Sequence, residues 1–222
     1  MCNRSVSVAG MLTVCGVVVL IVSLACRASE QERFELNTTS PDGTYRALFK
    51  EQVSVPGPLH HEVQFDVLKG DLRIVKDELL YKGGAYDSRF PELFPEHRWI
   101  SSSVLRFGGK DNLPEAQHDE ISIENATDRT LTYLRVNDGK YEVFLLFELQ
   151  PRSFVTLYVQ PQTDEGQDLS YIGCKGRFDD GTSIAEVAGN FRVRGRYHGR
   201  SHYSVKISDK GVQITSKELE SI

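Results

Sequence analysis

The alternation of hydrophobic and polar residues is most regular between residues 131 and 160, where turn signals separate three apolar segments. These segments cover residues 131–136, 141–149 and 154–160. Asp138-Gly139 lies between the first two, and Asp-Gly is typical of a hairpin turn because glycine readily adopts positive φ. Pro151 lies between the second and the third, where it withholds a backbone donor and ends a strand. The pattern predicts a meander of three consecutive strands.

The middle strand of this meander is expected to be apolar on both faces. Successive side chains of a strand point to opposite sides, so every second residue shares a face. One face carries Val143, Leu145 and Phe147, and the other carries Phe144 and Leu146. A strand of this kind belongs inside a layered structure, with other elements covering both of its faces.

The rest of the chain after residue 33 also consists of short segments of strand character separated by turns or polar loops. These segments cover residues 44–52, 61–68, 72–76, 78–82, 99–107, 121–124, 171–178, 182–187, 191–197, 203–208 and 212–216. Regular spacing of short strands is typical of a sandwich or barrel. We expect an all-β, two-sheet β-sandwich of about a dozen strands over residues 34–216, with a barrel-like fold as the alternative and residues 217–222 as a tail.

The N-terminal segment differs in composition, because Arg4 is the only charged residue among the first 25. Residues 6–25 are mostly apolar, and about 20 apolar residues suffice to cross a bilayer as a helix. Ser23-Leu24-Ala25-Cys26 resembles a bacterial lipoprotein cleavage box, although Ser23 stands where leucine is usual. We expect residues 1–25 to be a signal or transmembrane segment and residues 26–33 a tether. The membrane attachment is then either a lipid on Cys26 or a retained helix.

Charge and cysteine content narrow the function classes further. The formal net charge of −5 argues against a general nucleic-acid binder, because neutralising phosphates requires a basic surface. Cys174 is the one cysteine beyond Cys26, so the domain has no internal disulfide and depends on its own core. We expect Cys174 to be a buried small hydrophobe rather than a reactive thiol.

The chain contains none of the sequence motifs that mark common catalytic or metal sites. We therefore expect a non-catalytic protein without a metal or cofactor. The alternative is an envelope hydrolase or a carbohydrate-binding module that uses the aromatic loop of residues 83–98. That loop and its surroundings carry Tyr86, Phe90, Phe94 and Trp99, and the competing interpretation is that these rings cover the edge of the core.

Residues 187–208 are basic and contain no acidic residue, although the protein is acidic overall. Alternation predicts a hairpin of residues 191–197 and 203–208, in which His198 faces His202 and Arg194 faces Lys206. Like charges opposite each other destabilise a strand pair, so an anion is expected between them. The alternatives are that a neighbouring strand, through Glu186, or the loop of residues 164–168 supplies acidic groups, or that solvent screens the charges. The candidate anion-binding residues are Arg192, Arg194, Arg196, His198, Arg200, His202 and Lys206.

These patterns together predict a membrane-anchored, exported protein of the bacterial cell envelope, on the extracytoplasmic side. Its β-sandwich is expected to serve binding or assembly. The candidate partners are an anionic lipid, an envelope polymer or an acidic protein, in addition to the membrane that holds the N-terminal segment.

Overall fold

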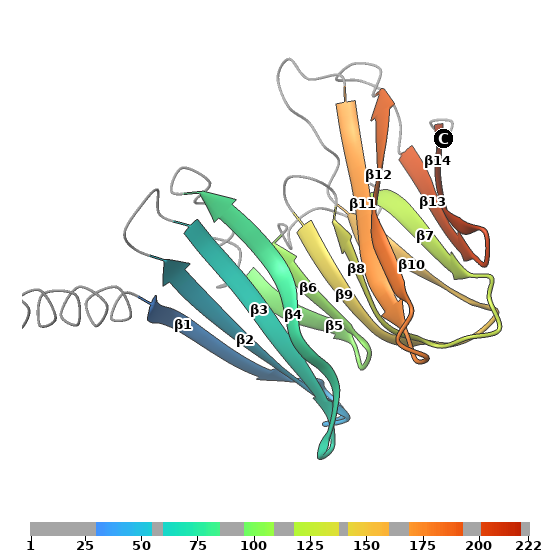
Figure 1. The fold of residues 1–222 in the computed structure, drawn as a ribbon. Helices are drawn as coiled ribbons and strands as arrows, with labels where there is room; N and C mark the ends of the chain where they lie inside the picture. The colour runs from blue at the N-terminus through green and yellow to red at the C-terminus, as the bar shows by residue number, and fades with distance from the viewer. Residues whose placement is uncertain are drawn as a thin grey trace, which may run out of the picture.

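The computed structural model describes residues 30–54, 60–84, 96–108, 118–137, 142–159, 169–192 and 201–218. These residues form fourteen strands in three sheets and no α-helix (Figure 1). The predicted all-β, sandwich-like class is therefore confirmed. The layers number three where two were expected.

The first sheet consists of four strands that pair in the order of the sequence. They are β1 (Glu30–Thr39), β2 (Tyr45–Ser54), β3 (His60–Lys69) and β4 (Leu72–Gly84). Short turns join β1 to β2 and β3 to β4. Gly43 and Gly70 occupy these turns with φ of 74° and 57°, a conformation that glycine adopts without a steric penalty.

The middle sheet has six strands in the order β12-β11-β8-β9-β6-β5. Its strands are β5 (His97–Ser101), β6 (Val104–Gly108), β8 (Leu131–Asn137), β9 (Glu142–Leu149), β11 (Leu169–Phe178) and β12 (Ser183–Arg192). All of its neighbouring strands are antiparallel.

The third sheet has four strands in the order β10-β7-β13-β14. Its strands are β7 (Asp119–Asn125), β10 (Ser153–Val159), β13 (Ser201–Ser208) and β14 (Gly211–Glu218). β7 and β13 run parallel, and the other two pairs of this sheet are antiparallel.

The middle sheet lies between the other two, so that it contributes to two hydrophobic cores (Figure 1). Leu145 and Phe147 of β9 pack with apolar residues of the first sheet. Phe144 and Leu146, on the opposite face of β9, pack with apolar residues of the third sheet. The expectation that this strand is covered on both faces is confirmed. Complete burial of each such side chain contributes about 1.5–3 kcal/mol to stability.

The predicted meander is correct for its first two strands and wrong for its third. β8 and β9 form a hairpin, but β10 pairs with β7 in the third sheet instead of with β9. The second neighbour of β9 is β6. The chain changes layer at the turn between β9 and β10, where Glu148 and Arg152 have φ of 52° and 54°, values that non-glycine residues seldom adopt.

Candidate functional site

The predicted basic hairpin is wrong in its pairing. β12 pairs with β11 in the middle sheet, whereas β13 has β14 on one side and β7 on the other. Both edges of β13 are therefore occupied. Lys206 has Gln213 and Glu124 as cross-strand neighbours in place of Arg194, and His202 has Lys217 and Glu120 in place of His198. Alternation determines which side chains share a face, but it does not determine which strand lies alongside.

Only part of the candidate anion-binding set belongs to the residues that the structure describes. Nζ of Lys206 lies 3.1 Å from Oε2 of Glu124, so β7 supplies its acidic neighbour. Glu186, which the alternative interpretation named, instead pairs with Arg135 at 2.9 Å. Nε2 of His202 lies 2.8 Å from Oγ of Ser122. Arg192 ends β12, without a described side chain, and the remaining members lie outside the described residues: Arg194, Arg196, His198 and Arg200. Anion binding at this segment stays a prediction.

Two further expectations fall wholly or largely outside the described ranges. Cys26 and the N-terminal segment precede residue 30, and most of the aromatic loop, residues 85–95, is likewise not described. Trp99 next to that loop donates a hydrogen bond from Nε1 to Oγ1 of Thr38 at 3.0 Å. Its ring packs against Phe147 with centroids 5.8 Å apart. Trp99 thus covers the core between the first and middle sheets, as the competing interpretation of the aromatic loop predicted.

The third sheet presents its outer face in three rows, each with one residue from every strand. The central row contains only hydroxyl side chains, namely Thr156, Ser122, Ser204 and Thr215. The flanking rows are Tyr158, Glu120, His202 and Lys217, and Phe154, Glu124, Lys206 and Gln213. Neighbouring strands lie about 4.8 Å apart, so the central row is a ladder of four hydroxyl groups across the sheet. We call these three rows the outer face.

Two aromatic side chains border the outer face on β10. Phe154 is 77% exposed and Tyr158 is 40% exposed, and they are the two aromatic members of the exposed large hydrophobic residues in the described ranges. They point to the same side of β10 because they are four residues apart. At about 3.4 Å per residue, their Cα atoms are separated by roughly 13–14 Å.

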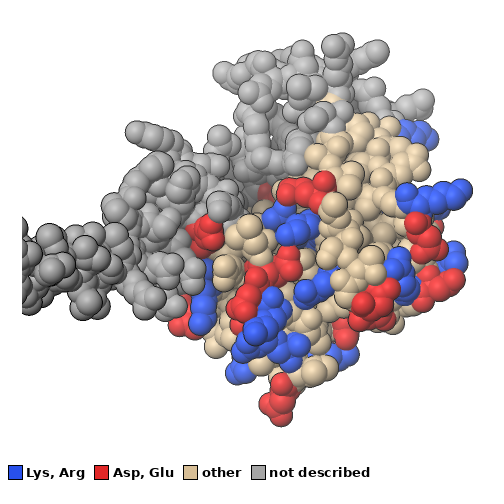
Figure 2. Space-filling model, viewed as in Figure 1, with Lys and Arg blue, Asp and Glu red and all other residues tan. Residues whose placement is uncertain are grey.

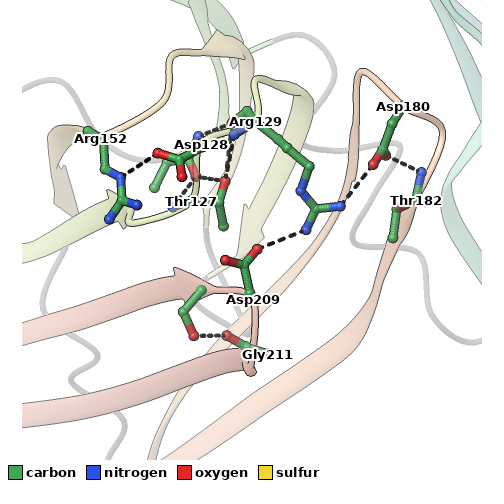
Figure 3. A network of polar contacts seen from close by, with 10 residues as sticks. Thr127, Asp128, Arg129, Arg152, Asp180, Thr182, Asp209 and Gly211 are labelled. Atoms are coloured by element: carbon green, nitrogen blue, oxygen red, sulfur yellow. Dashed lines mark hydrogen bonds and ion pairs between the residues drawn. The ribbon is translucent and has the colours of Figure 1, made fainter.

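At one end of the molecule, a polar network joins four turns of the middle and third sheets (Figure 3). The guanidinium of Arg129 bonds to Asp180 at 2.9 Å and to Asp209 at 3.4 Å, and it lies over the ring of Phe178. A backbone hydrogen bond from Thr182 and a side-chain hydrogen bond from Arg129 lower the pKa of Asp180 to about 2. Figure 2 shows acidic and basic side chains intermixed over the described part of the visible face.

Asn125 forms the buried part of this network. Its side-chain amide donates hydrogen bonds to the backbone carbonyl groups of Arg129, Leu149 and Gln150, at 2.8, 3.1 and 3.0 Å. Its Oδ1 accepts hydrogen bonds from the backbone N–H and the hydroxyl of Thr127. The network therefore fixes turns relative to one another, and we assign it a structural role.

Two other polar clusters connect the first sheet to the middle sheet. Glu148 of β9 accepts hydrogen bonds from the hydroxyl of Tyr45 at 2.7 Å and from Nζ of Lys69 at 2.6 Å. Oε1 of Glu78 in β4 lies 2.9 Å from Nζ of Lys175 in β11. Glu78 also forms a side-chain hydrogen bond with Tyr133 of β8. These carboxylates are engaged in inter-sheet contacts.

A buried ion pair lies within the middle sheet, on the face that borders the third sheet. Nη2 of Arg106 in β6 is 2.7 Å from Oε1 of Glu142 in β9, and the two side chains are 8% and 0% exposed. A buried charge needs such a partner, because the desolvation of an isolated charge costs several kcal/mol. Both residues lie in segments that the sequence predicts as strands, but neither stood out as one of a pair.

Cys174 is buried in the core between the middle and third sheets, as expected. Burial raises the pKa of its thiol to about 11, so the thiol stays protonated at neutral pH. Within the described ranges, no group of three or more His, Cys, Asp or Glu residues is placed to hold a metal ion. Nor do those residues include a helix that is long and apolar enough to cross a membrane.

Comparisons with known proteins do not assign the chain to a family. No protein family model matches the chain, and no curated protein sequence matches it. A solved structure of a protein from Eubacterium rectale is similar at 14% identity with a TM-score of 0.29, over 52% of this chain and 100% of that one. A likeness of this size carries no argument about fold or function.

Proposed function

We propose that this protein is a membrane-anchored, exported protein of the bacterial cell envelope, without catalytic activity, which binds a sugar polymer on the outer face. The observation that carries the proposal is the hydroxyl ladder of the central row. Its last member, Thr156 of β10, lies between two aromatic residues of the same strand, Phe154 and Tyr158. The anchor is the N-terminal segment, through lipidated Cys26 or a retained helix.

The side chains of the outer face match the chemistry of a sugar polymer. Hydroxyl groups both donate and accept hydrogen bonds, as sugar hydroxyl groups do, and Glu120 and Glu124 in the flanking rows accept them. Phe154 and Tyr158 offer flat apolar surfaces on which the C–H faces of sugar rings stack. Because the aromatic rings are separated along β10, a polymer can contact both of them at once, whereas a single sugar cannot.

The lowered pKa values of three carboxyl groups have a structural explanation. Catalytic groups are usually shifted in pKa so that they are ready for proton transfer in a cleft. Here Glu78, Glu148 and Asp180 have lowered pKa values, and each is bonded to side chains of another strand or turn. Their shifts are explained by structural contacts alone.

The test is co-sedimentation of the full chain, purified in detergent, with insoluble peptidoglycan and other insoluble envelope polysaccharides. We expect the Phe154→Ala, Tyr158→Ala double variant to bind at least about tenfold less tightly, because stacking area is lost without disturbing the core. Leu72→Ala is the matched control, since Leu72 is an exposed apolar residue of the first sheet.

The hydroxyl ladder is tested separately with the Ser122→Ala, Ser204→Ala double variant. We expect weaker sedimentation with the same polymer and an unchanged far-UV circular dichroism spectrum. A wild-type protein that sediments with none of the polymers overturns the proposal. So does equal binding by the wild type and both double variants.

A further inference from the structure

The edges of the three sheets differ in one respect. A strand at an edge presents unpaired backbone N–H and C=O groups, and proteins commonly place exposed charges there to prevent pairing with another chain. Five of the six edge strands carry an exposed charged residue: Glu35 on β1, Lys76 on β4, Arg98 on β5, Glu186 on β12 and Lys217 on β14. In β4, irregular pairing adds to this protection.

β10 is the exception. Its sequence, Ser-Phe-Val-Thr-Leu-Tyr-Val, contains no charge, no proline and no glycine. Within the described part of the chain, β10 is hydrogen-bonded to β7 on one side only. On the outer face, β10 carries Phe154 and Tyr158, the two exposed aromatic residues of the described ranges. An edge of this composition that is unpaired among the described residues is suited to accept another strand.

We propose that β10 pairs with β10 of a second copy of this chain, antiparallel, about a two-fold axis that passes beside Thr156. The choice of partner rests on the self-complementarity of the strand. In this register, Phe154 lies opposite Tyr158 of the second copy, and Tyr158 lies opposite its Phe154. Aromatic cross-strand pairs stabilise antiparallel strands.

The same register is favourable on the axis and on the inner face. Thr156 lies opposite its own copy, and Thr–Thr pairs are favourable across antiparallel strands. Val155 lies opposite Leu157, so that the core-facing sides of the two strands also match. Because the strand is uncharged, no like charges meet anywhere along it. A symmetric contact of this type closes with two subunits.

Pairing through β10 joins the two third sheets into one sheet of eight strands, which has two copies of β14 at its edges. The central row of the outer face then continues from one copy into the other, and the aromatic residues move from its border to its centre. The inference depends on the edge of the sheet and holds whatever the outer face binds.

Cysteine cross-linking in membranes of expressing cells tests the register. Thr156→Cys places two thiols opposite each other across the axis, where cross-strand Cβ atoms lie about 4.5–5.5 Å apart. Oxidation is expected to give a disulfide-linked species of twice the mass of the chain. Thr215→Cys is the matched control: it lies in the same row, on β14, and carries the same four native cysteines. We expect no additional cross-link from it.

Sedimentation velocity of the purified full chain in detergent tests the energetics, with no polysaccharide present. Thr156→Lys brings two like charges together at the axis and is expected to raise the dimer dissociation constant at least about tenfold. Thr215→Lys adds the same charge away from the axis and is expected to leave the dimer intact. Unchanged circular dichroism and unfolding midpoints show that both variants fold.

Three results overturn the inference. The first is a wild-type chain that sediments as a monomer at every concentration. The second is equal cross-linking of the two cysteine variants. The third is a Thr156→Cys product whose mass is not twice that of the chain, because it identifies a different protein as the occupant of this edge.

Discussion

At Gly176 in β11, the backbone passes so close to β8 that one added carbon atom has no room. A Cβ atom at this position would lie 2.6 Å from the carbonyl oxygen of Tyr133 and 3.0 Å from Cδ1 of Leu134. The carbonyl belongs to the backbone of the neighbouring strand, which cannot move without disturbing the middle sheet. Glycine is therefore required here for proximity rather than for an unusual φ.

We predict that Gly176→Ala destabilises the protein by about 1–3 kcal/mol, the usual cost of overpacking a well-packed site. Gly189→Ala is the matched comparison. Its added Cβ would lie equally close, at 2.6 Å, to the far end of the Phe191 side chain, which can turn aside. Urea unfolding of both variants is expected to give the larger loss for Gly176→Ala. Equal losses of unfolding free energy in the two variants would show that the close approach of the Tyr133 carbonyl oxygen adds no further destabilisation.

At the scale of the sheets, hydrogen bonds and ion pairs of Glu148 and Glu78 join the first sheet to the middle sheet, in addition to the apolar core. Burial opposes ionisation of Glu148, but hydrogen bonds from Lys69 and Tyr45 outweigh it and lower its pKa. For Glu78, burial is likewise outweighed by hydrogen bonds from Tyr133 and Lys175. The ionised form of both carboxyl groups is therefore favoured in the folded protein.

These lowered pKa values predict the direction of the pH dependence. The unfolded chain binds protons at these carboxyl groups more readily than the folded one, so their stabilising contribution is present at neutral pH and is lost as the pH falls below about 4.5. We expect Glu148→Gln to lose less stability between pH 7 and pH 3 than the wild type, in urea unfolding at each pH. Glu78→Gln is expected to behave in the same way. An acid dependence identical to that of the wild type would show that these contacts do not determine it.

The sequence predicted most of the strands but not their neighbours. It missed β1, which begins at residue 30 within the expected tether, and it joined β5 and β6 into one strand over residues 99–107. The hydrophobicity of β9 on both faces identified a covered strand, and the alternation in β13 is typical of a strand with one solvated face. The pattern thus carried information about layers. It could not determine that β10 leaves β9 or that β13 lies beside β7, because any alternating strand satisfies the same burial requirement. The hydroxyl ladder went unrecognised for this reason, since it exists only once four strands are placed in order.

For the whole molecule, attachment to a membrane remains a prediction from residues 1–26. If Cys26 carries lipid, Cys26→Ser is expected to block processing and leave a longer product, still held in the membrane by its uncleaved helix. Fractionation and immunoblotting, with a labelled fatty acid to detect the lipid, distinguish the two forms of attachment. Release of the wild-type protein by salt alone would contradict both of them, because only electrostatic association is weakened by salt.

The parallel pairing of β7 and β13 also determines when the fold can form during synthesis. Glu124 and Lys206, which meet across this pair, are 82 residues apart, whereas the strands of the first sheet are neighbours along the chain. Closing so long a loop is slow, since its entropic cost precedes any gain from contacts. The pairing of Ile121 and Ile123 in β7 with β13 therefore forms only after the last part of the chain has left the ribosome. Until then the third sheet lacks β13 and β14, and the core-facing apolar residues of β7 and β10 are only partly covered, a condition that favours aggregation.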